Sequence, residues 1–374
     1  MDAISNSGDT LLILLLFWGM FLPIGAKWSV DSLLNGTVLK KKIFSAATIA
    51  LYIQFALLYI TTGIFKGNYL SWHDGSHLYL TFSRFEYMNP IAFLIYPHYE
   101  LLSFLTHFTL FLELFGPLLF FIPFFFLPVR MVGILLFAGL QISIAITMKV
   151  GFFPISSLAG VLVFIPAQFW DLKLLQKTKN KLTYSIKLFL NRFKIEKNEP
   201  AERSTYTPNS FVNLFAAFML VYVLFWNLNE ISSVFSLPEP LKKPGYYLKV
   251  DQRWAMFSSP PQYSRMYSVH AHFEDGIVKD VMEDLKNEYS NKKGYRHVTF
   301  KNDRWRKLFS DQIRYSWYPE YRESLLSYFY NRESLRGKSL MKIELFETRF
   351  RIGKSYDLSE IDDRVLLTKE ALKE

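Results

Sequence analysis

The chain of 374 residues contains no cysteine. Without thiols it can form neither a disulfide framework nor a thiolate metal site. Charged residues make up only 20% of the sequence, below the roughly 25% that is usual for soluble domains. Hydrophobic residues make up 51%, which is too many for a disordered chain. These values exclude a small disulfide scaffold and an unfolded tail, and they indicate a chain rich in apolar segments.

The start of the sequence is a poor match for a secretory signal peptide. The first apolar run, Thr10 to Ala26, follows only the acidic residues Asp2 and Asp9. A signal peptide begins with a positively charged region, which this sequence lacks. We therefore interpret the run as a short membrane segment, interrupted by Pro23.

Five further apolar runs approach the length that crosses a bilayer, about 20 residues at a rise of about 1.5 Å each. A buried core helix of a soluble protein is the alternative for any one of them, but six in one chain make that alternative a poor one. The sequence predicts an all-α polytopic membrane bundle of about six membrane segments. The five further runs are Phe44 to Ile64, Leu101 to Leu127, Met131 to Thr147, Phe152 to Trp170 and Phe211 to Leu228.

Basic residues orient the bundle, because cytoplasmic loops carry an excess of Lys and Arg. Lys40 to Lys42 precede the second segment, and Arg130 lies between the third and fourth. We interpret 172–209 as a basic cytoplasmic linker and 210–229 as the last membrane helix. The loop 67–98 and everything after Asn229 then lie outside. The basic residues of the linker are Lys173, Lys177, Lys179, Lys181, Lys187, Arg192, Lys194, Lys197 and Arg203.

The net charge of +10 does not indicate a nucleic-acid partner. Much of it comes from the linker, where topology and attraction to anionic lipid are sufficient reasons. The sequence contains no nucleic-acid reader motif. The expected partner is the lipid bilayer, with no nucleic acid.

Residues 230–374 have the composition of a small extracytoplasmic α+β domain. Arg265 to His272 alternates, Glu274-Asp275-Gly276 is a turn signal, and Ile277 to Val281 continues the extended pattern, which predicts a β-hairpin. Asp303 to Tyr330 has helical spacing, and Leu340 to Ile352 reads as another strand. No catalytic motif is recognisable in this domain.

Few histidines could bind metal. His270 and His272 lie on one face of a strand, and His73 and His77 are four residues apart beside Trp72. Neither pair has a third ligand nearby in the sequence. We predict no metal site, and we expect His73 and His77 to lie in a solvated loop.

Polar groups within apolar segments are costly, and each is a functional hypothesis. Lys66 ends the second apolar run, and two interpretations are open. The lysine could extend its ammonium group to the membrane surface. Alternatively, burial keeps the amine neutral, so that it acts as a general base near neutral pH. The other polar groups are Asp9, Gln54, His107, Glu113 and Gln141.

Glu113 lies inside the third apolar run, where a carboxylate must be protonated or paired. Either state suggests a polar pocket within the bundle, although a purely structural hydrogen bond is an equal alternative. His107 precedes it by six residues, about 120° around a regular helix. The two side chains therefore do not share a face.

Four short segments of the first half form an ordered series. They are Trp28 to Asn35, Tyr59 to Lys66 followed by Trp72 and Gly75, Thr106 to Glu113 followed by Gly116, and Gln141 to Pro154 followed by Ser157 to Ala159. In this order and at these separations they resemble the vitamin K-dependent gamma-glutamyl carboxylases and related bacterial membrane proteins with the HTTM (horizontally transferred transmembrane) domain. The resemblance covers about residues 8–171, so we assign 1–171 to a carboxylase-like membrane domain.

The resemblance implies a chemistry and a location. In the carboxylases a lysine acts as base on a reduced quinone of the vitamin K hydroquinone type, which reacts with oxygen so that glutamate can take up carbon dioxide. Carried over, Lys66 is the catalytic base of a carbon–carbon lyase in the bacterial inner or plasma membrane. The implied cofactors are a reduced quinone, oxygen and carbon dioxide. The candidate pocket residues are Asp9, Trp28, Asp31, Gln54, His107, Glu113 and Gln141.

The sequence departs from the carboxylase pattern at three positions. Family histidines fall at Gly8 and Gln141, and a family aspartate falls at Glu113. The large luminal domain of the carboxylases is not recognisable. An alternative function therefore stays open, a non-enzymatic scaffold or maturation factor for an exported peptide. A transporter is disfavoured, because the sequence has no repeat halves.

Overall fold

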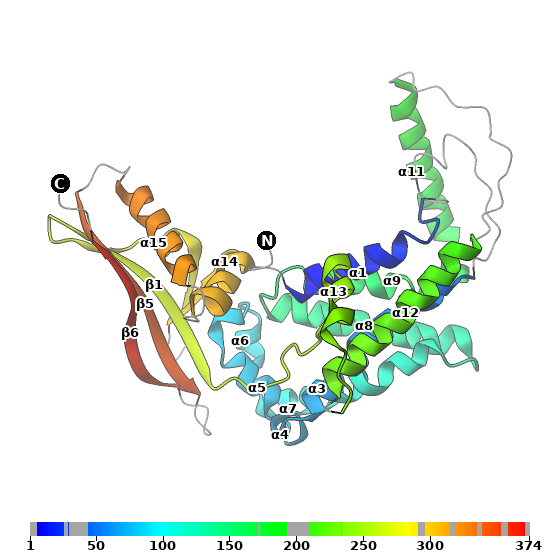
Figure 1. Ribbon diagram of the computed structural model, residues 1–374, viewed down its shortest axis with the longest axis horizontal. Coiled ribbons are helices and arrows are strands. Elements are labelled where there is room, and N and C mark those ends of the chain that lie inside the picture. Colours follow the sequence, from blue (N-terminus) through cyan, green and yellow to red (C-terminus); the bar gives the residue numbers. More distant parts are fainter. Residues whose placement is uncertain are drawn as a thin grey trace.

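The computed structural model describes residues 6–25, 29, 44–170, 173–192, 209–232, 234–290, 296–314, 319–334, 339–352 and 358–370. Figure 1 shows two parts, a group of helices and a curved antiparallel sheet with helices on one side. The helices of the first part are α1 (Ser7–Gly19), α3 (Ala46–Gly67), α4 (Leu70–His73), α5 (His77–Phe82), η2 (Phe85–Tyr87), α6 (Ala92–Ile95), α7 (Tyr99–Phe115), η3 (Gly116–Phe120), α8 (Phe126–Thr147), α9 (Phe153–Leu162), α10 (Ala167–Trp170), α11 (Lys173–Arg192), α12 (Ser210–Ile231) and α13 (Glu239–Leu248).

Four helices in the described part of the chain are long and apolar enough to cross a membrane. They are α3, α7 continued by η3, α8 and α12, each 22 residues long. The predicted six spans are not confirmed, because α1 and α9 have only 13 and 10 residues. Ten residues rise about 15 Å, half of the hydrocarbon thickness. Pro23 and Pro166 each follow the last helical residue by four positions, where proline has no N–H for that residue's carbonyl and its ring clashes with it.

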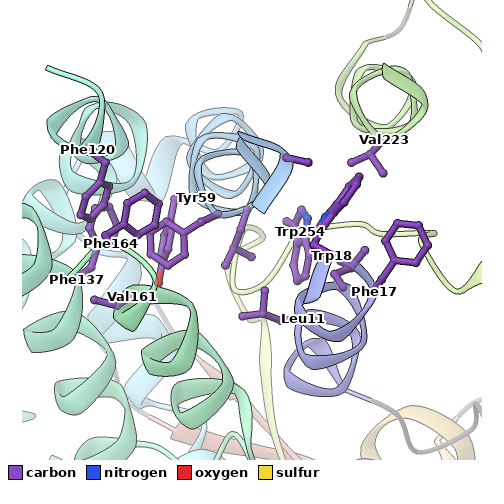
Figure 2. Close-up of a cluster of buried hydrophobic side chains, with 14 of the residues drawn as sticks. Leu11, Phe17, Trp18, Tyr59, Phe120, Phe137, Val161, Phe164, Val223 and Trp254 are labelled. Carbon is purple, nitrogen blue, oxygen red and sulfur yellow. The ribbon is translucent and has the colours of Figure 1, made fainter. Parts of the chain in front are cut away.

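Aromatic side chains fill the core of the helical part. Phe120 and Phe164 stack with ring centres 4.0 Å apart, and Tyr59 and Phe137 lie 4.3 Å apart. Figure 2 shows this cluster on one side of α3, and the pair Trp18 and Trp254 on the other side. Trp254 comes from the segment after α13, so the chain re-enters the bundle before it reaches the sheet.

A buried polar network holds this re-entering segment. Gln54 Nε2 donates to Gln252 Oε1 at 2.7 Å, and Trp254 Nε1 donates to the same oxygen at 2.7 Å. Trp18 Nε1 donates to Gln54 Oε1 at 3.3 Å, and Trp226 Nε1 donates to the Gln252 carbonyl at 3.1 Å. Gln54 therefore attaches the C-terminal half to the bundle, because a buried amide must find partners.

The second part is the predicted α+β domain. Its main sheet has the order β2-β1-β5-β6, and β3 pairs with β4 in a separate hairpin. The predicted hairpin is confirmed, with His270 opposite Asp280 and Gly276 at φ 79° in the turn. The elements are β1 (Tyr263–Phe273), β2 (Val278–Asp280), β3 (Lys286–Ser290), β4 (Arg296–Phe300), α14 (Asp303–Lys307), the π-helix η5 (Leu308–Ile313), α15 (Pro319–Ser334), β5 (Leu340–Ile352) and β6 (Leu358–Glu370).

Candidate functional site

The site is organised around one buried ion pair. Lys66 Nζ lies 2.6 Å from Glu113 Oε1, and each side chain is only 6% exposed. The second carboxylate oxygen, Oε2, is buried and makes no hydrogen bond to the residues that the structure describes. The pair joins the end of α3 to the end of α7, so the lysine does not extend toward the membrane surface. One oxygen of Glu113 is left for a ligand or for a proton.

A glycine brings the two helices together. A Cβ on Gly63 would lie 2.8 Å from the side chain of Leu114, so α7 touches the backbone of α3 at this point. Gly63 lies one helical turn before Lys66, and Leu114 follows Glu113 directly. The close crossing therefore sets the short distance between the amine and the carboxylate.

Trp72 forms a wall beside the amine. The Lys66 Nζ lies 4.5 Å from the centre of the Trp72 ring, within the range of a cation–π contact. Trp72 Nε1 donates to the Ser258 carbonyl at 3.1 Å, which ties the wall to the re-entering segment. The indole is thus held at both its apolar face and its polar edge.

His77 lies inside this wall, which corrects the prediction of a solvated loop. Its ring stacks on Trp72 at 4.2 Å, and Ser71 Oγ lies 2.9 Å from Nδ1. The residue is fully buried. His73 does lie on the surface, with Nε2 2.7 Å from the Gly67 carbonyl. The loop folds inward because it buries the large indole of Trp72.

We expect the buried imidazole to make stability fall in mild acid. Burial, and then the charge of Lys66, lower the pKa of His77 to about 3. The unfolded chain takes up this proton near its usual pKa of about 6.5, so stability is fully present above that pH and declines below it, by up to about 1.4 kcal/mol per pH unit. The measurement is the unfolding free energy between pH 7 and pH 4.5.

The matched control for this pH dependence is His77→Phe, which keeps a ring on Trp72 but cannot titrate. Its stability should vary less with pH than that of the parent chain, because carboxylates elsewhere titrate in both proteins. Equal slopes in the two proteins would contradict the assignment.

An apolar cavity of about 370 Å³ adjoins the ion pair. Lys66 and Glu113 are its charged lining residues, and Thr81 is one of four lining hydroxyl residues. Leu135, which lines it from α8, is 67% exposed, so the cavity lies toward the lipid-facing side of the bundle. An apolar cavity with a few convergent polar groups is typical of a binding site for a lipophilic molecule. Its remaining lining residues are Trp72, Leu78, Phe82, Ile95, Leu102, Leu105, Phe108, Thr109, Leu136, Gly139, Leu140, Ser143, Ile144, Thr147, Met148 and Phe257.

A smaller chamber of about 30 Å³ lies on the other side of the pair and contains Gln141. Gln141 Nε2 donates to the Tyr59 hydroxyl at 2.8 Å, and this hydroxyl lies 2.5 Å from Ser157 Oγ. Gln141 Oε1 is buried and makes no hydrogen bond to any described residue. Gln141 therefore lines the same chamber as Lys66 and Glu113.

The other predicted pocket residues lie elsewhere. Gln54 belongs to the network around Gln252. His107 is exposed, and its ring lies 2.9 Å from the His73 carbonyl, so it fastens the loop rather than facing Glu113. Trp28 and Asp31 lie outside the described residues.

Asp9 is an attachment point between the two parts of the chain. Both of its carboxylate oxygens accept from Arg304 of α14, at 2.8 Å each. Asp9 also accepts from the Asn6 backbone at 2.7 Å, which caps α1. The Asp9 carboxylate near the start of α1 therefore holds the C-terminal α+β domain and does not contact Lys66.

Sequence reasoning missed two residues of the site. His77 carried a signal, since it follows Trp72 closely, but we read its polar neighbours as a solvated loop. Phe257 carried no such signal, because it lies in the second half of the chain, far in sequence from the other residues of the site. Its φ of 51° is unusual for a bulky residue, and it lines both chambers.

Fold and site together define an integral membrane protein in which a buried lysine–glutamate pair faces an apolar cavity. The model of the HTTM domain matches residues 6–170, so this part of the chain is an HTTM domain. The match includes Lys66, Glu113 and Gln141. No curated protein matches the chain. No solved structure matches it either.

Proposed function

We propose that the protein is a membrane enzyme related to the vitamin K-dependent carboxylases, with Lys66 as general base. The observation that supports this proposal is the buried Lys66–Glu113 pair in the lining of an apolar cavity. A structural ion pair would not need an adjoining cavity of about 370 Å³, a size within the roughly 300–1,000 Å³ of ligand sites.

The pair can supply a neutral amine. Transfer of the ammonium proton from Nζ to Oε1 across 2.6 Å would leave both groups uncharged. The Lys66 amine can then take a proton from a hydroxyl in the cavity. Glu113 then holds the first proton on Oε1, and its Oε2 is left to accept a hydrogen bond from a ligand.

The residues present fit a reduced quinone. The cavity walls are mostly aliphatic and aromatic, and Lys66 and Glu113 supply the charged groups that could face the hydroxyl groups of a flat ring. Lys66 and Glu113 would contact the hydroxyl end. When bound, a reduced quinone would be oxidised by oxygen, and this reaction would drive removal of the glutamate proton that a carboxyl group from carbon dioxide then replaces. The apolar walls exclude water from such chemistry.

We further propose that the outer domain lies outside the bacterial inner or plasma membrane, as the distribution of basic residues indicates. The cavity and the ion pair would then be reached from the extracytoplasmic side. An exported peptide or protein is the substrate that suits this location.

The test compares Lys66→Met with the parent chain, in nanodiscs supplied with a reduced naphthoquinone, oxygen and isotopically labelled bicarbonate. We expect turnover of the quinone to fall by about 10²–10⁴-fold, the usual contribution of a general base. Mass spectrometry of co-expressed exported proteins should show labelled carboxyl groups on glutamate with the parent chain only. Lys279→Met, which removes an exposed lysine of β2, is the control.

Turnover that is unaffected by Lys66→Met would overturn the base assignment. It would favour the alternative, a scaffold or maturation factor that binds an exported peptide. Quinone turnover that depends on Lys66, without any carboxylated glutamate, would keep the base and replace carboxylation with a different oxidation.

A further inference from the structure

A second cavity, larger than the first, lies between the helical part and the outer domain. It has a volume of about 600 Å³. Its charged lining residues are all cationic, and none of the described residues that line it is an aspartate or a glutamate. We call it the arginine cleft. The cationic residues are Arg84, Arg265, Arg306, Lys307 and Arg314.

Two guanidinium groups of the arginine cleft share one aromatic ring. Arg84 Cζ lies 4.1 Å from the centre of the Tyr87 ring, and Arg306 Cζ lies 4.0 Å from it. Arg84 comes from the loop before α7, and Arg306 comes from α14 of the outer domain. The helical part and the α+β domain thus each place one guanidinium group against the Tyr87 ring.

Arg265 adds a third, nearly buried guanidinium. Its side chain is 10% exposed, and its Nε makes no hydrogen bond to a described residue, although Glu347 Oε1 lies 3.3 Å away. Burial, and then the positive charge of Arg314, lower the pKa of Arg265. Glu347 and Glu86 offset part of the cost of burying Arg265 beside Arg314, and an anion in the cleft would offset more of it.

The carboxylates that pair with these cations do not themselves line the cleft. Arg84 Nε lies 3.0 Å from Glu86, and Arg306 Nη2 lies 2.7 Å from Asp303. A guanidinium has five N–H donors in a fork, and a carboxylate on one side engages only part of them. The arginines are therefore held in place while the cleft keeps its positive lining.

We infer that the arginine cleft binds a phosphate group. Several forked donors around one space suit a tetrahedral oxyanion, which accepts on more sides than a planar carboxylate. Thr81 and Phe257 line both this cleft and the apolar cavity, so the polar and apolar spaces adjoin. A phosphate carried on an apolar chain, as in an anionic phospholipid, fits this arrangement, and a soluble phosphate ester shares the same chemistry. The inference goes beyond the proposed function and does not depend on Lys66.

The test measures binding to the purified full-length chain in an uncharged detergent. One arm uses a short-chain phosphatidylglycerol, the second uses inorganic pyrophosphate, and the third uses a glutamate-rich peptide. We expect Arg84→Gln and Arg265→Gln each to weaken phosphate binding about 10–100-fold, the range for a lost charge-assisted hydrogen bond. Lys279→Gln, which removes an exposed cation of the same domain, should change nothing.

The outcomes are decisive in both directions. Binding of the lipid alone identifies a headgroup site, and binding of pyrophosphate as well identifies a site for soluble phosphate esters. Tighter binding of the glutamate-rich peptide than of either phosphate would overturn the inference. Equal binding by Arg84→Gln and Lys279→Gln would also overturn it. Arg84 is 22% exposed at its side chain, so its variant should fold even if Arg265→Gln does not.

Discussion

Glu113→Leu is expected to destabilise the protein by about 3–5 kcal/mol, because it leaves a buried ammonium group without its counter-ion. The lysine and the carboxylate are each 6% exposed and lie 2.6 Å apart, so neither group can be hydrated in place. The measurement is the free energy of unfolding in detergent or in a bilayer at pH 7. The bundle should remain helical, since the substitution removes a charge and keeps the volume of the side chain.

The double variant Lys66→Met/Glu113→Leu is the matched control. Replacing both partners of a buried pair with apolar groups of similar size is often neutral. We expect its stability to lie within about 1 kcal/mol of the parent chain, far above that of Glu113→Leu. If Glu113→Leu is as stable as the double variant, Lys66 does not carry an unmet charge and the ion pair contributes little.

The second large effect is expected at Gly8, where α1 meets the start of α9. A Cβ at this position would lie 2.5 Å from the backbone nitrogen of Phe153, and backbone cannot move aside as a flexible side chain can. Gly8→Ala should therefore destabilise the chain by about 1–3 kcal/mol, the usual cost of overpacking. Thermal unfolding of the variant checks this value.

Gly19 provides the comparison within the same helix. A Cβ there would have nothing within 4 Å. Alanine is the better helix former, so Gly19→Ala should be neutral or stabilise the chain by up to about 1 kcal/mol. Equal effects at the two positions would mean that α1 does not pack against α9 as described.

The contact at Gly8 also bears on the departure from the carboxylase pattern. The resemblance to the carboxylases implies a histidine at this position, yet the structure leaves no room there for any side chain. The carboxylate of the next residue, Asp9, forms an ion pair with Arg304 of α14. This end of α1 therefore serves to pack and attach, and the proposed chemistry has to rest on Lys66, Glu113 and Gln141.

Local pattern was sufficient for part of the regular structure. Four apolar runs correspond to α3, α7, α8 and α12, the runs Thr10 to Ala26 and Phe152 to Trp170 gave only short helices, and the predicted strand at Leu340–Ile352 matches β5 at both ends. Hydrophobic length and alternation act within one element, so they can be read from neighbouring residues. Strand β6 escaped prediction because Leu358–Glu370 is too polar to show a clear alternation.

The sequence by itself determined that this is a helical membrane protein with a C-terminal α+β domain, and it singled out Lys66 and Glu113 as costly residues in an apolar setting. Only the tertiary structure decided that these two meet, that Gln141 joins them, and that Gln54, His107 and Asp9 serve other contacts. The physical reason is distance along the chain. Lys66 and Glu113 are separated by 47 positions, and their contact depends on how closely two helices cross at Gly63. No sequence pattern within either helix predicts that crossing.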